Sequence, residues 1–99
     1  MSYTKQSETK EHYGAARAAA VVINIDSLSD AGHEAVSASD LTGYVDNVHA
    51  VLVGSQEDPS YLISYDHLND QLHVHDGADG TSVSSGVGVG EVELLIIGD

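Results

Sequence analysis

Residues 61–76 read YLISYDHLNDQLHVHD, and this stretch contains the clearest secondary-structure pattern in the chain. Two segments of strand character, Tyr61–Asp66 and Gln71–Asp76, flank the polar residues His67–Asp70. Four residues are a common length for the connection of a β-hairpin. The stretch therefore predicts two antiparallel strands joined by a short turn.

A glycine-rich loop and a further strand follow this hairpin. The loop is Gly77–Gly90, GADGTSVSSGVGVG, which we expect to be flexible, with a candidate short strand at Thr81–Ser84. Glu91–Ile97, EVELLII, predicts a strong terminal strand. The chain after residue 60 therefore indicates strands and loops.

Two more segments of strand character precede the hairpin. The β-branched centre of Ala15–Leu28, AARAAAVVINIDSL, favours a strand, although its alanine run also fits a helix. Asn47–Val53, NVHAVLV, predicts a buried strand. The polar residues Gly54–Ser60, which include the only proline, are expected to end it as a loop.

The residues between these two strands predict another hairpin and one helical turn. Ser29–Gly32 is a turn signal, and His33–Ala38 alternates well enough for a short strand. The simplest interpretation is that this strand pairs with the one before it. Ser39 and Asp40 are expected to cap a single helical turn through Leu41–Gly43.

Together these elements predict an all-β protein. Six to seven strands, short turns and no long helix are typical of a small antiparallel β-sandwich or open barrel. The 99 residues fit a single domain, which we place at residues 13–99. Residues 1–12, MSYTKQSETKEH, lack periodicity and predict an extended, flexible N-terminal arm.

The arm and the residues next to it carry the candidate interaction site. Two tyrosines and all the basic residues of the chain lie here, namely Tyr3, Lys5, Lys10, Tyr13 and Arg17. We expect the arm to become ordered on the surface of a partner. The same composition also fits a terminus that has no function.

Charge is the strongest signal in the composition. Sixteen Asp and Glu stand against three Lys and Arg, which gives a formal net charge of −13. Two of the acids, Glu8 and Glu11, precede residue 18, so residues 18–99 hold fourteen acids and no Lys or Arg. The folded domain is expected to have a purely anionic surface.

Such a surface is typical of a protein from salty cytoplasm. Molar salt shortens the Debye length from about 8 Å to about 3 Å, which weakens the repulsion between carboxylates. Salt also strengthens apolar association, which suits a chain without Phe or Trp. The composition therefore predicts a halophilic host. The alternative, an acidic protein that binds a basic partner, does not explain the missing lysines.

The same charge distribution excludes nucleic acid as a partner of the domain. Binding of phosphates needs clustered Lys and Arg, which residues 18–99 lack. The sequence also has no apolar run of the roughly 18 residues that cross a bilayer, and no start that resembles a signal peptide. We expect no membrane partner and synthesis in the cytoplasm.

Three histidines form the one pattern that resembles a metal site. His73 and His75 are two apart on a strand and share a face, and His67 lies across the hairpin as a third candidate ligand. Alternation between a core face and a solvated face produces the same pattern, and we favour that interpretation. Whether His67, His73 and His75 bind a metal stays open.

No other motif indicates catalysis or a cofactor. Asp76–Gly80 lacks the alternating oxygen ligands of a calcium loop, and Gly86–Gly90 lacks the spacing of a phosphate-binding loop. Glu91 and Glu93 share a strand face, where we expect them to serve solvation. The chain has no cysteine and no nucleophile elbow. We expect a protein that is not an enzyme and binds no cofactor.

Residues 61–76, followed by Asp79–Thr81 and Val89–Leu94, resemble small virion proteins of haloarchaeal tailed viruses. The resemblance covers about the last 40 residues. It implies a repeated structural component of the virion, such as a capsid decoration protein, and no enzymatic activity. It assigns no functional residue.

From these features we expect a symmetric homo-oligomer, with a trimer as the first choice, bound to a major capsid protein or another virion protein. Val21–Ile23 and Leu94–Ile97 place apolar residues on both faces of a strand, so a neighbouring subunit should cover the second face. The protein would be located in the virion after assembly in the host cytoplasm. The alternative is a cytoplasmic binding module that recognises a small molecule or a basic protein through acidic loops.

Overall fold

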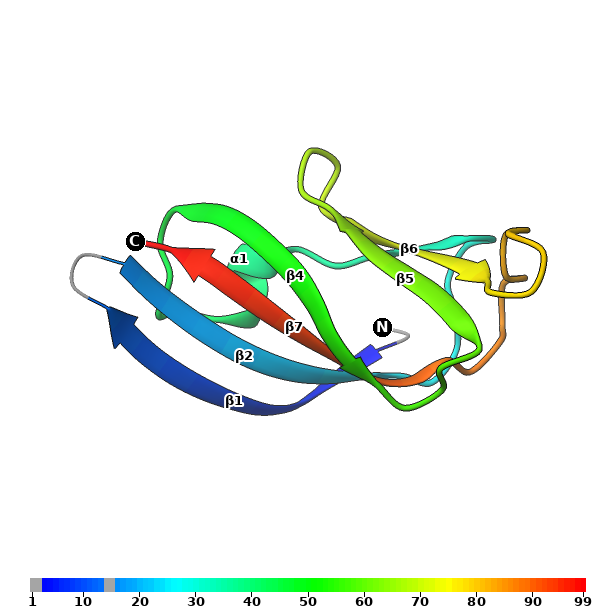
Figure 1. Cartoon of the computed structure of the whole chain (residues 1–99), viewed down its shortest axis with the longest axis horizontal. Coiled ribbons are helices and arrows are strands. Elements are labelled where there is room, and N and C mark those ends of the chain that lie inside the picture. Colours follow the sequence, from blue (N-terminus) through cyan, green and yellow to red (C-terminus); the bar gives the residue numbers. More distant parts are fainter. Residues whose placement is uncertain (1–2, 14–15) are drawn as a thin grey trace.

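A computed structural model describes residues 3–13 and 16–99, which form seven strands and one short helix in two antiparallel sheets (Figure 1). The first sheet has the strand order β1-β2-β7-β4, with β1 (Tyr3–Tyr13), β2 (Ala16–Ile25), β7 (Gly90–Gly98) and β4 (Val48–Gln56). The second has the order β3-β6-β5, with β3 (His33–Ala35), β6 (Gln71–Asp76) and β5 (Tyr61–Asp66). This architecture confirms the predicted all-β sandwich.

The core lies on one face of the first sheet. Side chains at alternate positions of β2 and β7 are fully buried there, for example Ile23 and Leu94. Leu72 and Val74 of β6 meet them from the second sheet, while the helix α1 (Ala38–Leu41) lies behind the first sheet beside β4 (Figure 1). The second sheet and the α1 segment together cover this face.

The hairpin of residues 61–76 forms as predicted. β5 and β6 pair from Tyr61 with Asp76 to Asp66 with Gln71. The turn closes because the Asp66 carboxylate accepts hydrogen bonds from the backbone amides of Leu68 (3.0 Å) and Asn69 (3.1 Å). The terminal strand β7 is also confirmed, whereas the candidate strand at residues 81–84 is reduced to one bridge between Ser82 and His75.

The predicted pairing of the two earlier segments is wrong. β2 is a strand through its alanine run, which also rules out the helical alternative, but its edges are occupied by β1 and β7. The short β3 therefore pairs with β6 in the other sheet, with His33 opposite His73. Hydrophobic alternation locates a strand but does not identify its neighbour, which here comes from residues far along the chain.

The structure does not show the flexible arm predicted for residues 1–12. Tyr3–Tyr13 form the edge strand β1, which pairs with β2 from Tyr3 opposite Ile25 to Tyr13 opposite Ala16. Its side chains are mostly exposed, so the sequence lacks the apolar alternation of a buried strand. Backbone hydrogen bonds to β2 supply the order that side-chain burial does not.

One tyrosine connects the second sheet with the α1 segment. The hydroxyl of Tyr65 in β5 donates to the carbonyl of Val36 (2.8 Å) and accepts from the amide of Ala38 (3.0 Å) at the start of α1. Burial raises the pKa of Tyr65 to about 12, and the nearby Asp70 acts in the same direction. This hydroxyl holds the α1 segment against the second sheet.

The Tyr65→Phe substitution is expected to lower the free energy of unfolding by about 1–3 kcal/mol, because the amide of Ala38 then lacks its acceptor. Urea unfolding in molar KCl measures this. Tyr61→Phe is the control, since Tyr61 is half-buried on the same strand and its hydroxyl has no partner among the described residues. Equal stabilities of the two variants would contradict this role of Tyr65.

Deletion of residues 1–13 should destabilise the protein and cause association, because it exposes the unpaired edge of β2. A flexible arm would instead be removed without effect. Urea unfolding and light scattering in molar KCl distinguish these outcomes. The Lys5→Gln variant is the control, since it keeps β1 and removes only an exposed ion pair with Glu8.

Candidate functional site

The face of the first sheet that points away from the core is also apolar. Strand register puts two rows of side chains there, with Ile97 between Ala18 and Ala50 in one row and Leu95 between Ala20 and Leu52 in the other. Val22 follows next to them on β2. Leu52 is 54% exposed. We call these seven residues the apolar face: Ala18, Ala20, Val22, Ala50, Leu52, Leu95 and Ile97.

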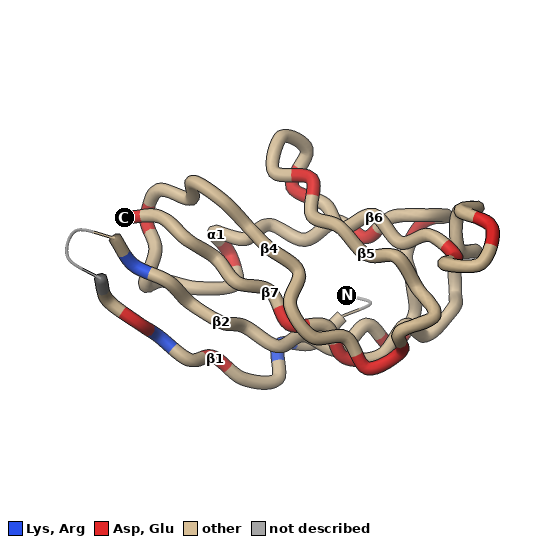
Figure 2. The backbone as a smooth tube through the Cα atoms, in the orientation of Figure 1, with Lys and Arg blue, Asp and Glu red and all other residues tan. Residues whose placement is uncertain are grey.

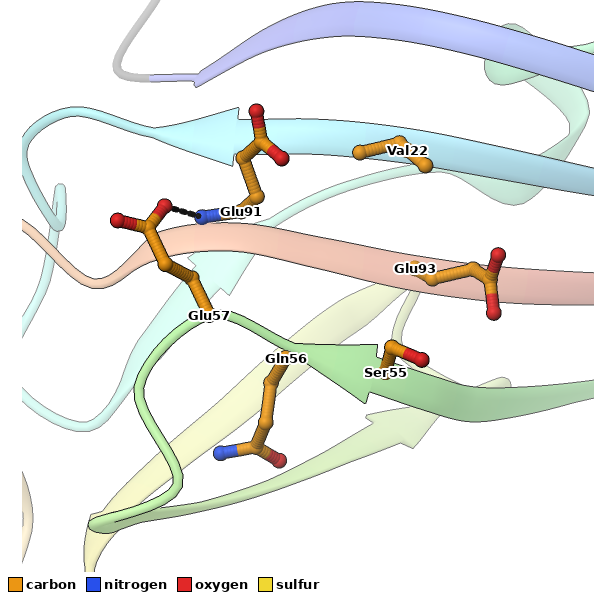
Figure 3. A pocket seen from close by; sticks show the side chains of 6 residues that line it. All are labelled: Val22, Ser55, Gln56, Glu57, Glu91 and Glu93. Carbon is orange, nitrogen blue, oxygen red and sulfur yellow. Dashed lines mark hydrogen bonds between the residues drawn. The ribbon is translucent and has the colours of Figure 1, made fainter.

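An acidic hollow adjoins the apolar face at one end of the sheet (Figure 3). It has a volume of about 470 Å³ and is lined by Val22, Ser55, Gln56, Glu57, Glu91 and Glu93. The register of β4 shifts between Val53 and Gln56, so two residues lie opposite Glu93 where a regular strand would have one. Strand β4 continues through this bulge to Gln56, beyond the predicted end of the strand at Val53.

The three carboxylates of the hollow do not converge on a common point. Glu57 accepts a hydrogen bond from the backbone amide of Glu91 at 3.0 Å, so it supports the backbone of β7. Figure 3 shows the side chain of Glu91 turned toward β2, whereas the side chain of Glu93 points away from the carboxylates of Glu57 and Glu91. The hollow is therefore a region of negative potential and has no set of ligands that could chelate an ion.

The predicted interaction residues pack on the chain's own body. Lys5 pairs with Glu8 at 2.7 Å. The ammonium of Lys10 and the guanidinium of Arg17 lie 5.9 and 5.3 Å from the ring centroid of Tyr44. Arg17 also donates to the carbonyl of Tyr44 at 3.1 Å. Lys10 and Arg17 therefore hold β1 and β2 against the loop that follows α1.

The other two predicted interaction residues are Tyr3 and Tyr13. Tyr3 is partly buried and packs against the core, and burial raises its pKa. The side chain of Tyr13 lies outside the described residues. In the middle of β1, hydrogen bonds from Lys5 and from Thr42, the latter at 2.5 Å, lower the pKa of Glu8. The strand is thus attached to the domain along much of its length.

The second sheet brings three histidines to its outer face. His73 and His75 lie as predicted, with ring centroids 6.3 Å apart, but their neighbour is His33, the cross-strand partner of His73. His67 belongs to the β5–β6 turn. Within the described part of the chain, no group of three or more His, Cys, Asp or Glu could hold a metal ion.

Sequence reasoning missed His33 because nothing local connects it with residues 73–75. Two of the three histidines on this face, His33 and His73, instead lie beside carboxylates. The Nε2 of His73 lies 3.2 Å from Asp66, whose pKa is lowered to about 2 by hydrogen bonds from Asn69 and then from His73. That of His33 lies 3.5 Å from Asp30. We interpret these three histidines as part of a solvated sheet face on which two of them are paired with carboxylates.

Comparison with protein-family models, with curated proteins and with solved structures finds no match. In the described residues, no helix is long and apolar enough to cross a membrane. The apolar face and the acidic hollow beside it are therefore the surface features from which a function can be argued.

The charges surround the apolar face and leave its middle free. Figure 2 shows β2, β7 and β4 without charge over their central stretches, with acids at one end of the sheet and along the loops. In the part of the chain that the structure describes, Glu8 is the only carboxylate paired with a Lys or Arg. Most of the negative charge is therefore not neutralised by a Lys or Arg of the described chain, and ions in solution would weaken the repulsion.

The melting temperature is accordingly expected to rise steeply with KCl concentration, with loss of the fold at low salt. Circular dichroism during dialysis from molar KCl measures this. Sucrose is the control, because it favours burial without screening charge and should restore the fold only weakly. A melting temperature that does not change with salt would show that the carboxylates are tolerated without screening.

Proposed function

We propose that the protein is a non-enzymatic structural component of the virion of a halophilic archaeal tailed virus. Its role would be that of a capsid decoration protein that stabilises the head shell as a symmetric oligomer. The observation that carries this proposal is the apolar face, an uncovered sheet surface within an otherwise anionic protein. A surface of this kind favours association with a protein neighbour.

The charge distribution supports the same proposal. Fourteen acids in residues 18–99 keep such a protein soluble in molar salt, where apolar association is strengthened and charge repulsion is weak. A protein that assembles in a halophilic host needs both properties. The resemblance of the last 40 residues to small virion proteins of haloarchaeal tailed viruses points to the virion as the place of assembly.

The acidic hollow favours a second candidate function. Glu57, Glu91 and Glu93 would attract a basic protein or a cationic small molecule, as expected of a cytoplasmic binding module. In molar salt this attraction is screened within about 3 Å. The module would therefore need contacts beyond charge, which places it behind the structural role.

Mass spectrometry of purified virus particles tests the structural role. We expect the protein in the particles at a copy number near that of the major capsid protein. Soluble host lysate is the matched control, and a protein found only there would favour the binding module. Detection at a few copies per particle would instead contradict a role as decoration of the shell and indicate a minor component.

A further inference from the structure

The outer surface of the first sheet has the dimensions of a protein interface. Its four strands are 9–11 residues long. With about 4.8 Å between strands and about 3.3 Å per residue, this surface measures roughly 600 Å² in projection. A stable complex buries about 800 Å² on each partner, and a pleated surface exposes more area than its projection. One sheet face is therefore large enough to pair with another.

Charge indicates what can cover this surface. A second copy carries the same net charge of −13, so two copies can approach closely only where neither presents a carboxylate. Over β2, β7 and β4 the two rows of the apolar face meet this condition, since they consist of Ala, Leu and Ile. On β1 the row of Ile97 ends at Glu11, which in a pair must lie opposite an uncharged residue. A basic partner would instead be attracted to the carboxylates at the border. The uncharged centre thus fits a second copy of this chain.

We propose that two copies pair face to face through the apolar face, about a two-fold axis that lies in the interface and runs perpendicular to the strands. This inference rests on the proposed function, because it assumes that the protein assembles with copies of itself. With the axis at the level of Ile96, midway between the rows, Leu95 of one copy lies opposite Ile97 of the other. Leu52 then lies opposite Ala50.

The orientation follows from the position of the acids. An axis perpendicular to the strands reverses the strand direction of the partner, so the two acidic hollows lie at opposite ends of the interface. An axis parallel to the strands would place Glu91 and Glu93 of both copies at the same end, where they would repel each other. A two-fold pair of this kind differs from the trimer predicted from the sequence, because face-to-face packing of two sheets joins two copies.

A matched pair of substitutions tests the surface. Leu52 is 54% exposed on the outer face of the first sheet and Leu62 is 59% exposed on that of the second. In molar KCl, light scattering should give the unchanged protein a mass near twice 10.3 kDa. Leu52→Asp should halve this mass and Leu62→Asp should leave it unchanged. Circular dichroism checks that both variants are folded.

Other results overturn the proposal. A monomer or trimer mass for the unchanged protein excludes the two-fold pair. Equal masses for the Leu52→Asp and Leu62→Asp variants exclude this face as the interface.

The orientation can be tested by cross-linking, because the chain has no cysteine of its own. Thr9 and Thr4 are exposed on β1, opposite Ala20 and Asn24 of β2. In the proposed pair the two copies of Thr9 are about 12 Å apart and those of Thr4 about 35 Å apart. A bis-maleimide that spans the shorter distance should therefore link Thr9→Cys into dimers and leave Thr4→Cys monomeric on a denaturing gel. Dimers of both variants, or of Thr4→Cys alone, would overturn this orientation.

Failure of this inference can be separated from failure of the proposed function. Particles that contain the protein at high copy number, together with a monomer in solution, would keep the virion role and reject the two-fold pair. A dimer in solution, together with absence of the protein from particles, would keep the two-fold pair and reject the virion role.

Discussion

The pairing of β2 with β7 is the contact on which the rest of the structure depends. It runs without interruption from Arg17 opposite Gly98 to Ile25 opposite Gly90. Side chains on one side of this pair form the centre of the core, and those on the other side form the apolar face. Because successive side chains of a strand point to opposite faces, a pair of strands whose central residues are apolar on both faces creates two surfaces that need cover. The second sheet and the α1 segment cover only one of them.

The placement of charge complements this arrangement. Most acids lie near the ends of strands, on the edge strand β1 or in the loops (Figure 2). Glu34, by contrast, is buried and binds the amide and hydroxyl of Ser29 at 2.8 and 2.7 Å. A buried carboxylate needs such partners because water no longer solvates it. Salt can therefore screen nearly all of the charge without entering the fold.

Local sequence patterns predicted the strands better than their partners. The hairpin at residues 61–76 was predictable because its strands are neighbours and its turn has the usual length. The pairing of β3 with β6 was not, because it depends on the edges of β2 being occupied by β1 and β7. For the same reason, the sequence pointed to His67 as the neighbour of His73, whereas the sheet register supplies His33.

By itself, the sequence determined the all-β class, the anionic character of the domain and the presence of strands with two apolar faces. These properties follow from composition and from the alternation of side chains, which are local. Only the tertiary structure decided that residues 3–13 form an edge strand, that Lys10 and Arg17 pack on Tyr44, and that the second apolar face stays open. Each of these depends on which segments meet in space, and hydrogen bonding along a strand edge leaves no signature in the side chains.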